Sequence, residues 1–321
     1  MLPEVLAALQ PRDGETYIDG TFGNGGYSKA ILQAANCNII ALDRDPNVKP
    51  RAAELSETYQ GRLKLIETPF SNMDEALGED KVDAVILDIG VSSMQLDQAE
   101  RGFSFMRAGP LDMRMSQSGP SASDAVNQLR EKDLTRIFQV YGEERKARRA
   151  AQFIVRAREE GALTTTDQLA GLLEQALGRH SKNHPATRVF QALRIFINDE
   201  LGELYRGLIA AENILRPGGR LIVVSFHSLE DRLVKKFLRR RSEKPSGGSR
   251  YQPEIVTNDF APSFDLEERS AIFPSDTEIS GNARSRSARM RWAVRTEAAM
   301  FDDNEDLLPK VPFLSDYKWA S

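Results

Sequence analysis

The stretch Tyr17-Ile-Asp-Gly-Thr-Phe-Gly-Asn-Gly-Gly-Tyr-Ser28 decides the fold that this sequence predicts. A short apolar run enters a glycine-rich turn, and helix-forming residues follow. Gly23, Gly25 and Gly26 permit positive φ angles and let a ligand approach the backbone closely. The free amides of a helix starting here favour a negatively charged group. The turn is not a Walker A loop, and Ser28 replaces the third glycine of a dinucleotide fingerprint. An ordinary strand–helix turn is therefore the alternative.

Three β-like runs alternate with helix-forming segments in the first ninety residues. They are residues 16–19, 38–43 and 83–88. This alternation predicts βαβ units and a parallel sheet. Each run ends in an aspartate, namely Asp19, Asp43 and Asp88. Because ligands bind at the carboxyl ends of parallel strands, we expect the three carboxylates to share one crevice.

Two of these aspartates indicate a nucleoside cofactor. Asp43 follows the glycine turn by roughly 20 residues, where a carboxylate can hydrogen-bond both hydroxyls of a ribose. Its alternative role is that of a turn aspartate before Pro46. Asp19 directly precedes the glycines, as in the loops of adenosylmethionine enzymes in which an acidic group faces the amino-acid end of the cofactor. A glycine turn and a ribose carboxylate leave two candidates, a dinucleotide and S-adenosylmethionine.

Beyond Gly90 the strand signal almost disappears until an apolar run resumes at 220–225. Residues 121–177 predict helices, and the pattern after Thr187 predicts one long helix that ends at the breaker 216–219. An α/β pattern that brackets a helical block predicts an insertion. We therefore expect three parts: a discontinuous α/β domain at 1–104 and 186–300, a helical insert for substrate recognition at 105–185, and a C-terminal tail at 301–321.

The composition excludes several classes of protein. The chain has 321 residues, 40% of them hydrophobic and 28% charged, which is typical of globular proteins. Apolar runs such as 221–224 are far too short to span a membrane, and the N-terminus lacks the pattern of a signal peptide. Cys37 is the only cysteine, so an internal disulfide and a cysteine-only metal cage are excluded. We expect a cytoplasmic protein, and the net charge of −4 gives no hint of nucleic acid.

A resemblance to one family rests on six ordered strings that span nearly the whole chain. They are DGTFGNGGYS, ILDIGVSSMQLDQAERGFSF, PLDMRM, HPATRVFQALRIFIN, VSFHSLEDRLVK and NARSRSARMR. The sequence resembles the bacterial small-subunit rRNA cytosine methyltransferases called RsmH or MraW. This resemblance implies a Rossmann-like S-adenosylmethionine methyltransferase sheet with an inserted all-helical domain.

The resemblance also implies an activity and a set of residues. The expected reaction is methylation of the exocyclic N4 amine of a cytosine in the decoding (P-site) region of 16S rRNA. The cofactor is S-adenosylmethionine, and the partner is 16S rRNA within the small ribosomal subunit. The oligomeric state stays open, a homodimer included. Besides Asp19 and Gly23 from the glycine turn, the implied cofactor contacts are Gly25, Gly26, Tyr27, Asp43, Phe70, Asp88 and Gln95.

The sequence departs from the family pattern at two places. Tyr27 stands where the family usually has histidine, so an aromatic ring can still pack but a histidine-specific role is lost. The usual His-x-Pro-Val lead-in is absent before Glu4.

Two candidate catalytic residues follow from the chemistry of the amine. The lone pair of a cytosine amine is delocalised, so methyl transfer needs in-line positioning, a hydrogen-bond acceptor and a proton sink. Asp88 can accept from the amine, although it can instead hold the methionine amine of the cofactor. His227 either takes the proton or caps a helix that begins near Leu229. Phe226 either stacks on an extruded base or fills the core.

Three basic stretches contrast with the acidic whole, at 145–158, 232–241 and 284–295. Clustered Arg and Lys bind phosphate backbones, although a solvated helix face is the usual alternative. In the last stretch, Met290 and Trp292 alternate with arginines, which predicts a strand with one buried and one basic face. The candidate RNA contacts are Arg239, Arg240, Arg284, Arg286, Arg289 and Arg291.

Two further pairs are ambiguous. His180 and His184 have the i, i+4 spacing of a zinc helix, but no glutamate stands beside His180, so we expect no metal site. Asp112 and Arg114 match the family string, or they form a local ion pair. Two functional alternatives stay open: a non-catalytic ribosome-assembly factor on the same fold, and a nicotinamide-dependent oxidoreductase.

Overall fold

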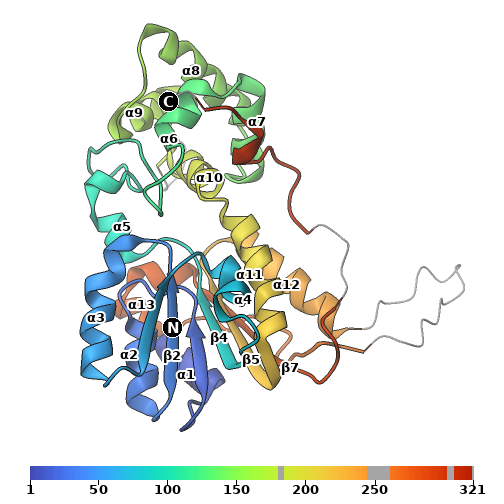
Figure 1. The fold of residues 1–321 in the computed structure, drawn as a ribbon. Coiled ribbons are helices and arrows are strands. Elements are labelled where there is room, and N and C mark those ends of the chain that lie inside the picture. The colour runs from blue at the N-terminus through green and yellow to red at the C-terminus, as the bar shows by residue number, and fades with distance from the viewer. Residues whose placement is uncertain (180–183, 244–260, 302–306, 320–321) are drawn as a thin grey trace, which may run out of the picture. The chain divides into compact units, whose positions relative to one another are not determined.

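The computed structural model describes residues 1–179, 184–243, 261–301 and 307–319. The chain forms two compact units (Figure 1). The sheet unit comprises Met1–Gly90 and Glu203–Leu308, and the helical unit comprises Val91–Gly202 and Pro309–Ser321. The boundaries predicted at 104/105 and 185/186 both lie within the helical unit, so this unit is longer than the expected insert and includes the chain's last segment.

The sheet unit contains a seven-stranded sheet in the order β3-β2-β1-β4-β5-β7-β6. Its strands are β1 Thr16–Asp19, β2 Asn38–Asp43, β3 Leu63–Glu67, β4 Val82–Asp88, β5 Leu215–Ser225, β6 Phe264–Asp265 and β7 Arg289–Arg295. The strands β1 to β5 are parallel, and β7 is antiparallel to both β5 and β6. This doubly wound arrangement confirms the predicted Rossmann-like fold class.

The three predicted runs are found as β1, β2 and β4, whereas β3 was missed. β3 is an edge strand that begins at the buried Leu63 and is otherwise half-buried or exposed, so its sequence lacks the apolar run that marks the inner strands. The inner strands carry fully buried side chains such as Ile18, Ile86 and Ile222. Burial on both faces is what makes such strands visible as apolar runs.

Helices surround this sheet (Figure 1). They are α1 Leu2–Leu9, α2 Gly26–Ala34, α3 Lys49–Thr58, α4 Met73–Leu77, α12 Ser228–Ser242 and α13 Asp276–Gly281, together with most of α11 Glu200–Ile214. Ile31 and Leu32 of α2 are buried, and Phe237 of α12 is fully buried.

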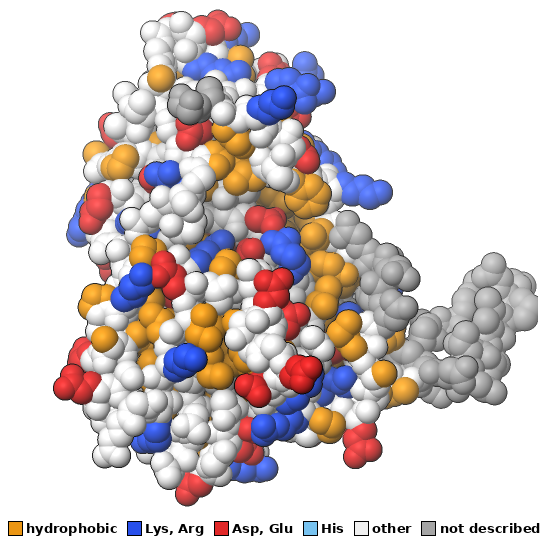
Figure 2. Space-filling view, viewed as in Figure 1, with side chains coloured by type: hydrophobic (Ala, Val, Ile, Leu, Met, Phe, Trp, Pro, Cys, Tyr) orange, Lys and Arg blue, Asp and Glu red, His pale blue; other side chains and the backbone are white. Residues whose placement is uncertain are grey.

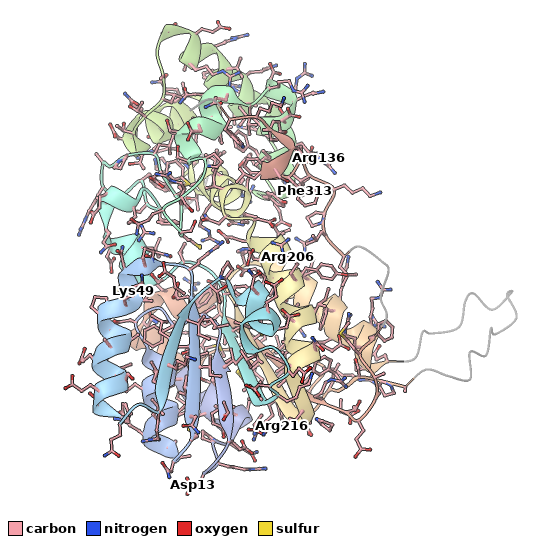
Figure 3. The ribbon with its side chains drawn as sticks, viewed as in Figure 1. Asp13, Lys49, Arg136, Arg206, Arg216 and Phe313 are labelled. Carbon is pink, nitrogen blue, oxygen red and sulfur yellow. The ribbon has the colours of Figure 1, made fainter. Side chains whose placement is uncertain are left out.

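The helical unit contains α5 Ser93–Asp97, α6 Ala122–Gln128, α7 Glu131–Val140, α8 Ala147–Glu160, α9 Thr166–Leu177 and α10 Thr187–Ile197. The helical prediction for 121–177 is confirmed. The segment 309–319 of the predicted tail belongs to this unit, where the guanidinium of Arg136 donates to the backbone oxygen of Lys310 at 2.9 and 3.0 Å. Phe301, at the start of the predicted tail, instead donates from its amide to Glu212 of the sheet unit. Phe313, from the same segment as Lys310, lies close to Arg136 (Figure 3). We call Pro309–Ser321 the returning segment.

The prediction of one long helix after Thr187 is wrong. The chain forms α10 and α11, separated by Asn198 and Asp199. Asp199 has a φ of 47°, a left-handed conformation that ends a helix. The Asn198 side chain donates to the Met113 backbone oxygen at 2.7 Å and accepts from the Met115 amide at 2.8 Å. The break therefore fastens a neighbouring loop. None of the described helices is long and apolar enough to cross a bilayer.

Candidate active site

The glycine turn joins β1 to α2, and two of its glycines differ in whether a side chain could replace them. Gly25 is the N-cap of α2 with a φ of 71°, and a Cβ there would approach Leu55 to 2.6 Å and the Phe22 ring to 2.9 Å. Glycine at this position is required by both the backbone and the packing. Gly26 has neither requirement, because a Cβ built on it would meet nothing within 4 Å. Open space therefore lies beside the first turn of α2.

The buried side chain of Asp19 stabilises this turn through hydrogen bonds. Its side chain is 1% exposed, and Oδ2 accepts from the Ser28 hydroxyl at 2.6 Å while Oδ1 accepts from the Thr21 amide at 3.3 Å. Burial raises the pKa of Asp19 to about 6. The carboxylate therefore ties β1 to the start of α2, and its assignment as a cofactor contact stays a prediction.

Asp43 links the end of β2 to the same turn. Its Oδ2 accepts from the Gly23 amide and its Oδ1 from the Asp45 amide, each at 2.8 Å. Each carboxylate oxygen can accept a second hydrogen bond. The side chain is only partly buried, so both oxygens can still receive the two hydroxyls of a ribose.

Asp88 ends β4 next to β1 and has a different environment. Its Oδ1 is buried and has no hydrogen-bond partner among the described residues. Burial raises the pKa of Asp88 to about 7, and the carboxylates of Asp19 and Glu230 act in the same direction. Buried polar atoms are normally satisfied, so an orphaned acceptor here indicates the position of a ligand.

Tyr27 contacts Asp88 directly. The tyrosine hydroxyl donates a hydrogen bond to the Asp88 carboxylate, which lowers the pKa of Asp88. Burial and this carboxylate in turn raise the pKa of Tyr27. The residue that departs from the family's histidine thus retains a polar interaction with Asp88.

Phe70 and Gln95, both implied by the resemblance, lie in different units. Phe70 follows β3 and packs between two glycines of the sheet unit: a Cβ on Gly207 would approach its ring to 2.4 Å, and one on Gly20 would approach its Cβ to 3.2 Å. Gln95 belongs to the helical unit, where its side chain accepts from the Ser92 amide in the capping box of α5. Their roles as cofactor contacts stay predictions.

His227 is the N-cap of α12, which is one of the two roles that the sequence predicts for it. Its Nδ1 accepts from the Glu230 amide at 3.4 Å, and Nε2 lies 2.9 Å from the buried carboxylate of Glu230. Nδ1 thus caps the helix start, whereas Nε2 is buried and has no hydrogen-bond partner among the described residues. The catalytic role of His227 stays a prediction. Phe226 is half-buried, and its ring lies 3.6 Å from a Cβ built on Gly90. It therefore lies near the segment that follows Asp88.

The predicted RNA contacts in the sheet unit are partly occupied by internal ion pairs. Arg289 and Arg291 both bind the buried Asp231 of α12, at 3.0 and 2.7 Å. Arg239 pairs with Glu243 at 2.7 Å. β7 is a strand, as expected, but its alternation is imperfect. Trp292 is only half-buried, whereas Arg295 is buried.

The remaining candidates among these arginines differ in exposure. Arg284 and Arg286 lie in an exposed 3-10 turn, Ala283–Ser287, and Arg240 of α12 is half-buried. Arg286 has no ion pair with a described residue. Whether any of these arginines binds RNA stays a prediction.

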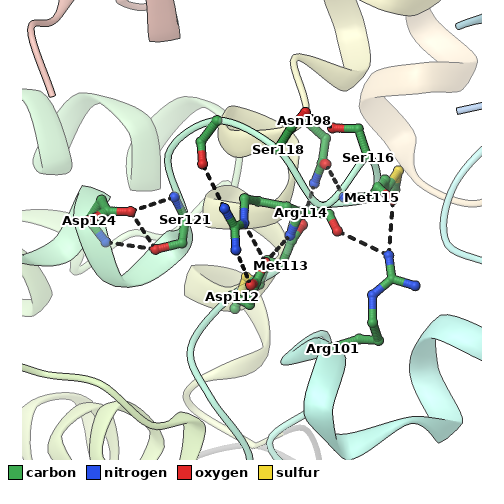
Figure 4. Close-up of polar contacts among 11 residues, drawn as sticks. Arg101, Asp112, Met113, Arg114, Met115, Ser116, Ser118, Ser121, Asp124 and Asn198 are labelled. Atoms are coloured by element: carbon green, nitrogen blue, oxygen red, sulfur yellow. Dashed lines mark hydrogen bonds and ion pairs between the residues drawn. The ribbon is translucent and has the colours of Figure 1, made fainter. Parts of the chain in front are cut away.

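The loop around Asp112 forms a local polar network (Figure 4). Arg114 donates to both oxygens of Asp112, at 2.9 and 2.6 Å, and this bond lowers the pKa of Asp112. Asp112 and Arg114 therefore form the local ion pair that is one of their two predicted roles. Arg101 donates to the backbone oxygen of Met115 at 3.0 Å, and the same loop is held by Asn198.

Of the histidine pair considered for zinc, His180 lies outside the described residues. His184 accepts a hydrogen bond from the Ala186 amide at 3.1 Å through Nδ1. Its ring centroid lies 4.7 Å from that of Phe105.

The three strand ends together define a site for a nucleoside cofactor in an enzyme of the Rossmann-like class. Asp43 retains two lone pairs for a ribose, and the space beside Gly26 lets a ligand approach the helix N-terminus. The orphaned Oδ1 of Asp88 leaves an open hydrogen-bond acceptor at the adjoining strand end. These groups fit S-adenosylmethionine, which would place its ribose at Asp43 and its sulfonium end towards Asp88.

Comparison with known proteins identifies the family. The MraW methylase family matches residues 1–296. The chain is 58% identical over 312 residues to "Ribosomal RNA small subunit methyltransferase H" of Maricaulis maris, covering 96% of this chain and 93% of that protein. It is 54% identical over 303 residues to the protein of that name from Parvibaculum lavamentivorans, covering 93% and 89%. The solved putative rRNA-methylase of Clostridium thermocellum is similar at a TM-score of 0.42 and 12% identity, covering 91% and 94%, too distant for any further argument.

The chain belongs to the MraW methylase family. The resemblance found in the sequence is thereby confirmed. The protein is a methyltransferase with S-adenosylmethionine as its cofactor, and the nicotinamide-dependent alternative is set aside.

Proposed function

We propose that this protein methylates the exocyclic N4 amine of a cytosine in the decoding (P-site) region of 16S rRNA. The names of its relatives support small-subunit rRNA as the substrate class. The observation that carries the choice of an amine is the buried, unpartnered Oδ1 of Asp88 at the carboxyl end of β4. An acceptor held there suits a target that donates N–H.

Asp88 performs the central step in this proposal. Its Oδ1 accepts one N–H of the cytosine amine, which turns the nitrogen lone pair out of the ring plane. S-adenosylmethionine supplies the methyl group when it is bound. As the new N–C bond forms, the methyl–sulfur bond breaks and its electron pair stays on sulfur as a neutral thioether, while the amine proton passes to the Asp88 carboxylate. A pKa of about 7 suits this role, because a general base works best when its pKa lies near the operating pH.

Two aromatic side chains support that step. The Tyr27 hydroxyl fixes the carboxylate of Asp88 through its hydrogen bond, so Oδ1 stays aimed at the target. The half-buried ring of Phe226, next to Gly90, offers a surface on which an extruded base can stack. We assign the proton transfer to Asp88 and not to His227, because the Nδ1 of His227 caps α12.

The test is transfer of a labelled methyl group to small ribosomal subunits isolated from cells that lack this protein. Digestion to nucleosides and mass mapping should place one methyl on the N4 atom of a decoding-region cytosine. Naked 16S rRNA is assayed in parallel to find which form is the substrate. Label on another base, or on a ring carbon, would refute the proposed position. No transfer from a chain that binds the cofactor would instead favour the assembly-factor alternative.

A further inference from the structure

The three basic stretches differ in how many of their arginines are paired with acidic residues of the protein. In the sheet unit, Arg289 and Arg291 are neutralised by Asp231, and the buried Arg241 is paired with the buried Glu212. The stretch 145–158 in the helical unit behaves differently. Figure 2 shows Lys and Arg side chains gathered where Figure 1 labels α7 and α8.

One face of α8 builds the core of the helical unit. Ala147, Ala150, Ala151 and Ile154 are buried, and the helix contacts α7 and α9. Arg158 also belongs to this side, because its guanidinium donates to the backbone oxygens of Val126 and Leu129, which end α6. This arginine is structural.

The opposite face is basic. At 3.6 residues per turn, Arg148, Arg149 and Arg156 lie on one side of the helix. All three are exposed, as is Arg145 in the turn before α8. Arg149 and Arg156 are seven residues apart, so their backbones are separated by about 10 Å, a length over which a nucleic-acid strand presents several phosphates.

These charges have few internal partners. Among the described residues, Arg145, Arg149 and Arg156 form no ion pair or hydrogen bond. Arg149 lies over the ring of Phe153 at 5.6 Å, which restricts its side chain without neutralising it. Arg148 approaches Glu131 only at 3.9 Å and is 80% exposed, so its charge is largely available.

The charge order of α8 is also unfavourable for the helix. The first turn has no acidic residue and carries Arg148 and Arg149, whereas Glu159 and Glu160 in the last turn outnumber its one basic residue, Arg158. Positive charge at the N-terminus and negative charge at the C-terminus both oppose the helix macrodipole. The N-cap residue, Lys146, makes no side-chain cap. A local arrangement that lowers stability without a packing gain is typical of a functional surface.

We propose that Arg145, Arg148, Arg149 and Arg156 form an RNA-binding face that contacts the phosphate backbone of the substrate outside the target nucleotide. We call this the α8 basic face. This inference rests on the proposed function, because it names how the same rRNA substrate is held. A phosphate backbone presents a row of negative charges that matches a row of guanidinium groups. An anionic protein surface would use only a few of these groups.

The experiment compares two triple variants of the full chain that lose the same charge. The test variant is Arg145→Gln, Arg149→Gln, Arg156→Gln. The control is Lys132→Gln, Arg179→Gln, Lys318→Gln, which removes three exposed cations scattered over the helical unit. Steady-state methylation of small subunits and binding of 16S rRNA fragments are measured between 50 and 200 mM salt, which are ordinary limits for such titrations.

The test variant should raise the KM for the RNA substrate by about 10-fold or more and lower the slope of log affinity against log salt by about 2 to 3. Its turnover number and its cofactor affinity should match those of the control. Its melting temperature should equal or slightly exceed that of the parent, since charges opposing the macrodipole are gone. An Arg→Lys triple variant should restore most of the affinity.

Equal KM values and equal salt slopes for the test and control variants would overturn the α8 basic face. That outcome is distinct from a failure of the proposed function, in which the parent protein itself transfers no methyl group to rRNA. Weaker binding of an acidic protein, with unchanged RNA binding, would also reject the proposal in favour of a protein partner.

Discussion

Asp19 and Asp88 end neighbouring strands of one sheet, and both have a raised pKa. Asp19 is buried, whereas Asp88 is half-buried with a buried Oδ1. Asp19 is satisfied internally by the Ser28 hydroxyl and the Thr21 amide, whereas Asp88 keeps one oxygen without a partner. The difference separates two uses of a strand-end carboxylate. One maintains the shape of the glycine turn, and the other is available for chemistry. Asp43 is intermediate, since each of its oxygens is bonded once, as in Asp19, but its side chain is only half-buried.

Asp88→Asn tests the open carboxylate and should have the largest effect. An amide cannot take the proton of the target amine, so single-turnover methyl transfer should fall by about 10²-fold or more at pH 8. Cofactor affinity, measured by calorimetry, should change much less. The reverse pattern would assign Asp88 to the methionine amine of the cofactor.

His227→Gln provides the comparison for that experiment. It removes an imidazole that the structure places at a helix cap, so it should lower stability by about 1 kcal/mol and leave turnover within a few-fold of the parent. A loss of turnover comparable with that of Asp88→Asn would return His227 to the catalytic machinery.

Asp43→Ala tests the intermediate carboxylate. Unpaired ribose hydroxyls should weaken cofactor binding by about 1–3 kcal/mol, roughly a 5- to 150-fold increase in Kd. Saturating cofactor should restore most of the turnover. Unchanged calorimetric affinity would show that the ribose lies elsewhere.

Asp19→Ala tests the satisfied carboxylate. It leaves the Ser28 hydroxyl and the Thr21 amide without their acceptor, which should lower the free energy of unfolding by about 1–3 kcal/mol. Thermal melting of the cofactor-free protein measures this loss. A variant as stable as the parent, but with much weaker cofactor binding, would place Asp19 among the direct contacts.

The pH profile gives the smallest and most specific effect. Asp88 must be ionised to accept the proton, so turnover should rise with pH through about 7. Tyr27→Phe removes a hydrogen bond that lowers the pKa of Asp88, so the rising limb should move to higher pH.

The free energy of unfolding should fall with pH over the range in which turnover rises. Because the folded-state pKa is raised from 3.8 to about 7, the contribution of Asp88 is favourable below pH 4 and is lost as pH rises through about 7. An unchanged rising limb in Tyr27→Phe would separate the tyrosine from the titrating group.

The sequence predicted the sheet and the strand-end aspartates because burial on both faces leaves apolar runs, and because glycines mark the turn that follows β1. It could not distinguish Asp19 from Asp88, since the distinction depends on Ser28 and Thr21 folding back onto one carboxylate. The break between α10 and α11 was missed for a similar reason. Asn198 leaves the helix to bond a loop more than 80 residues earlier in the chain.

Charge was the least reliable signal in the sequence. The stretch 284–295 appeared the most basic, yet two of its arginines are neutralised by Asp231, which lies more than 50 residues away. No local pattern reveals such a partner. The stretch 145–158 has the pattern of an ordinary helix face. It is distinguished by Arg145, Arg149 and Arg156, which lie on one exposed side without an ion pair or hydrogen bond among the described residues.

The returning segment at Pro309–Ser321 has a consequence for synthesis on the ribosome. Arg136 is made early, but its acceptor at Lys310 is 174 residues downstream. Since chains emerge N-terminus first, the helical unit stays unfinished while most of the protein is being translated. β5 and β7 of the sheet also follow the helical block, so each unit waits for segments made after the other has begun. Neither unit of the nascent enzyme can therefore be completed before segments that follow the helical block have been made.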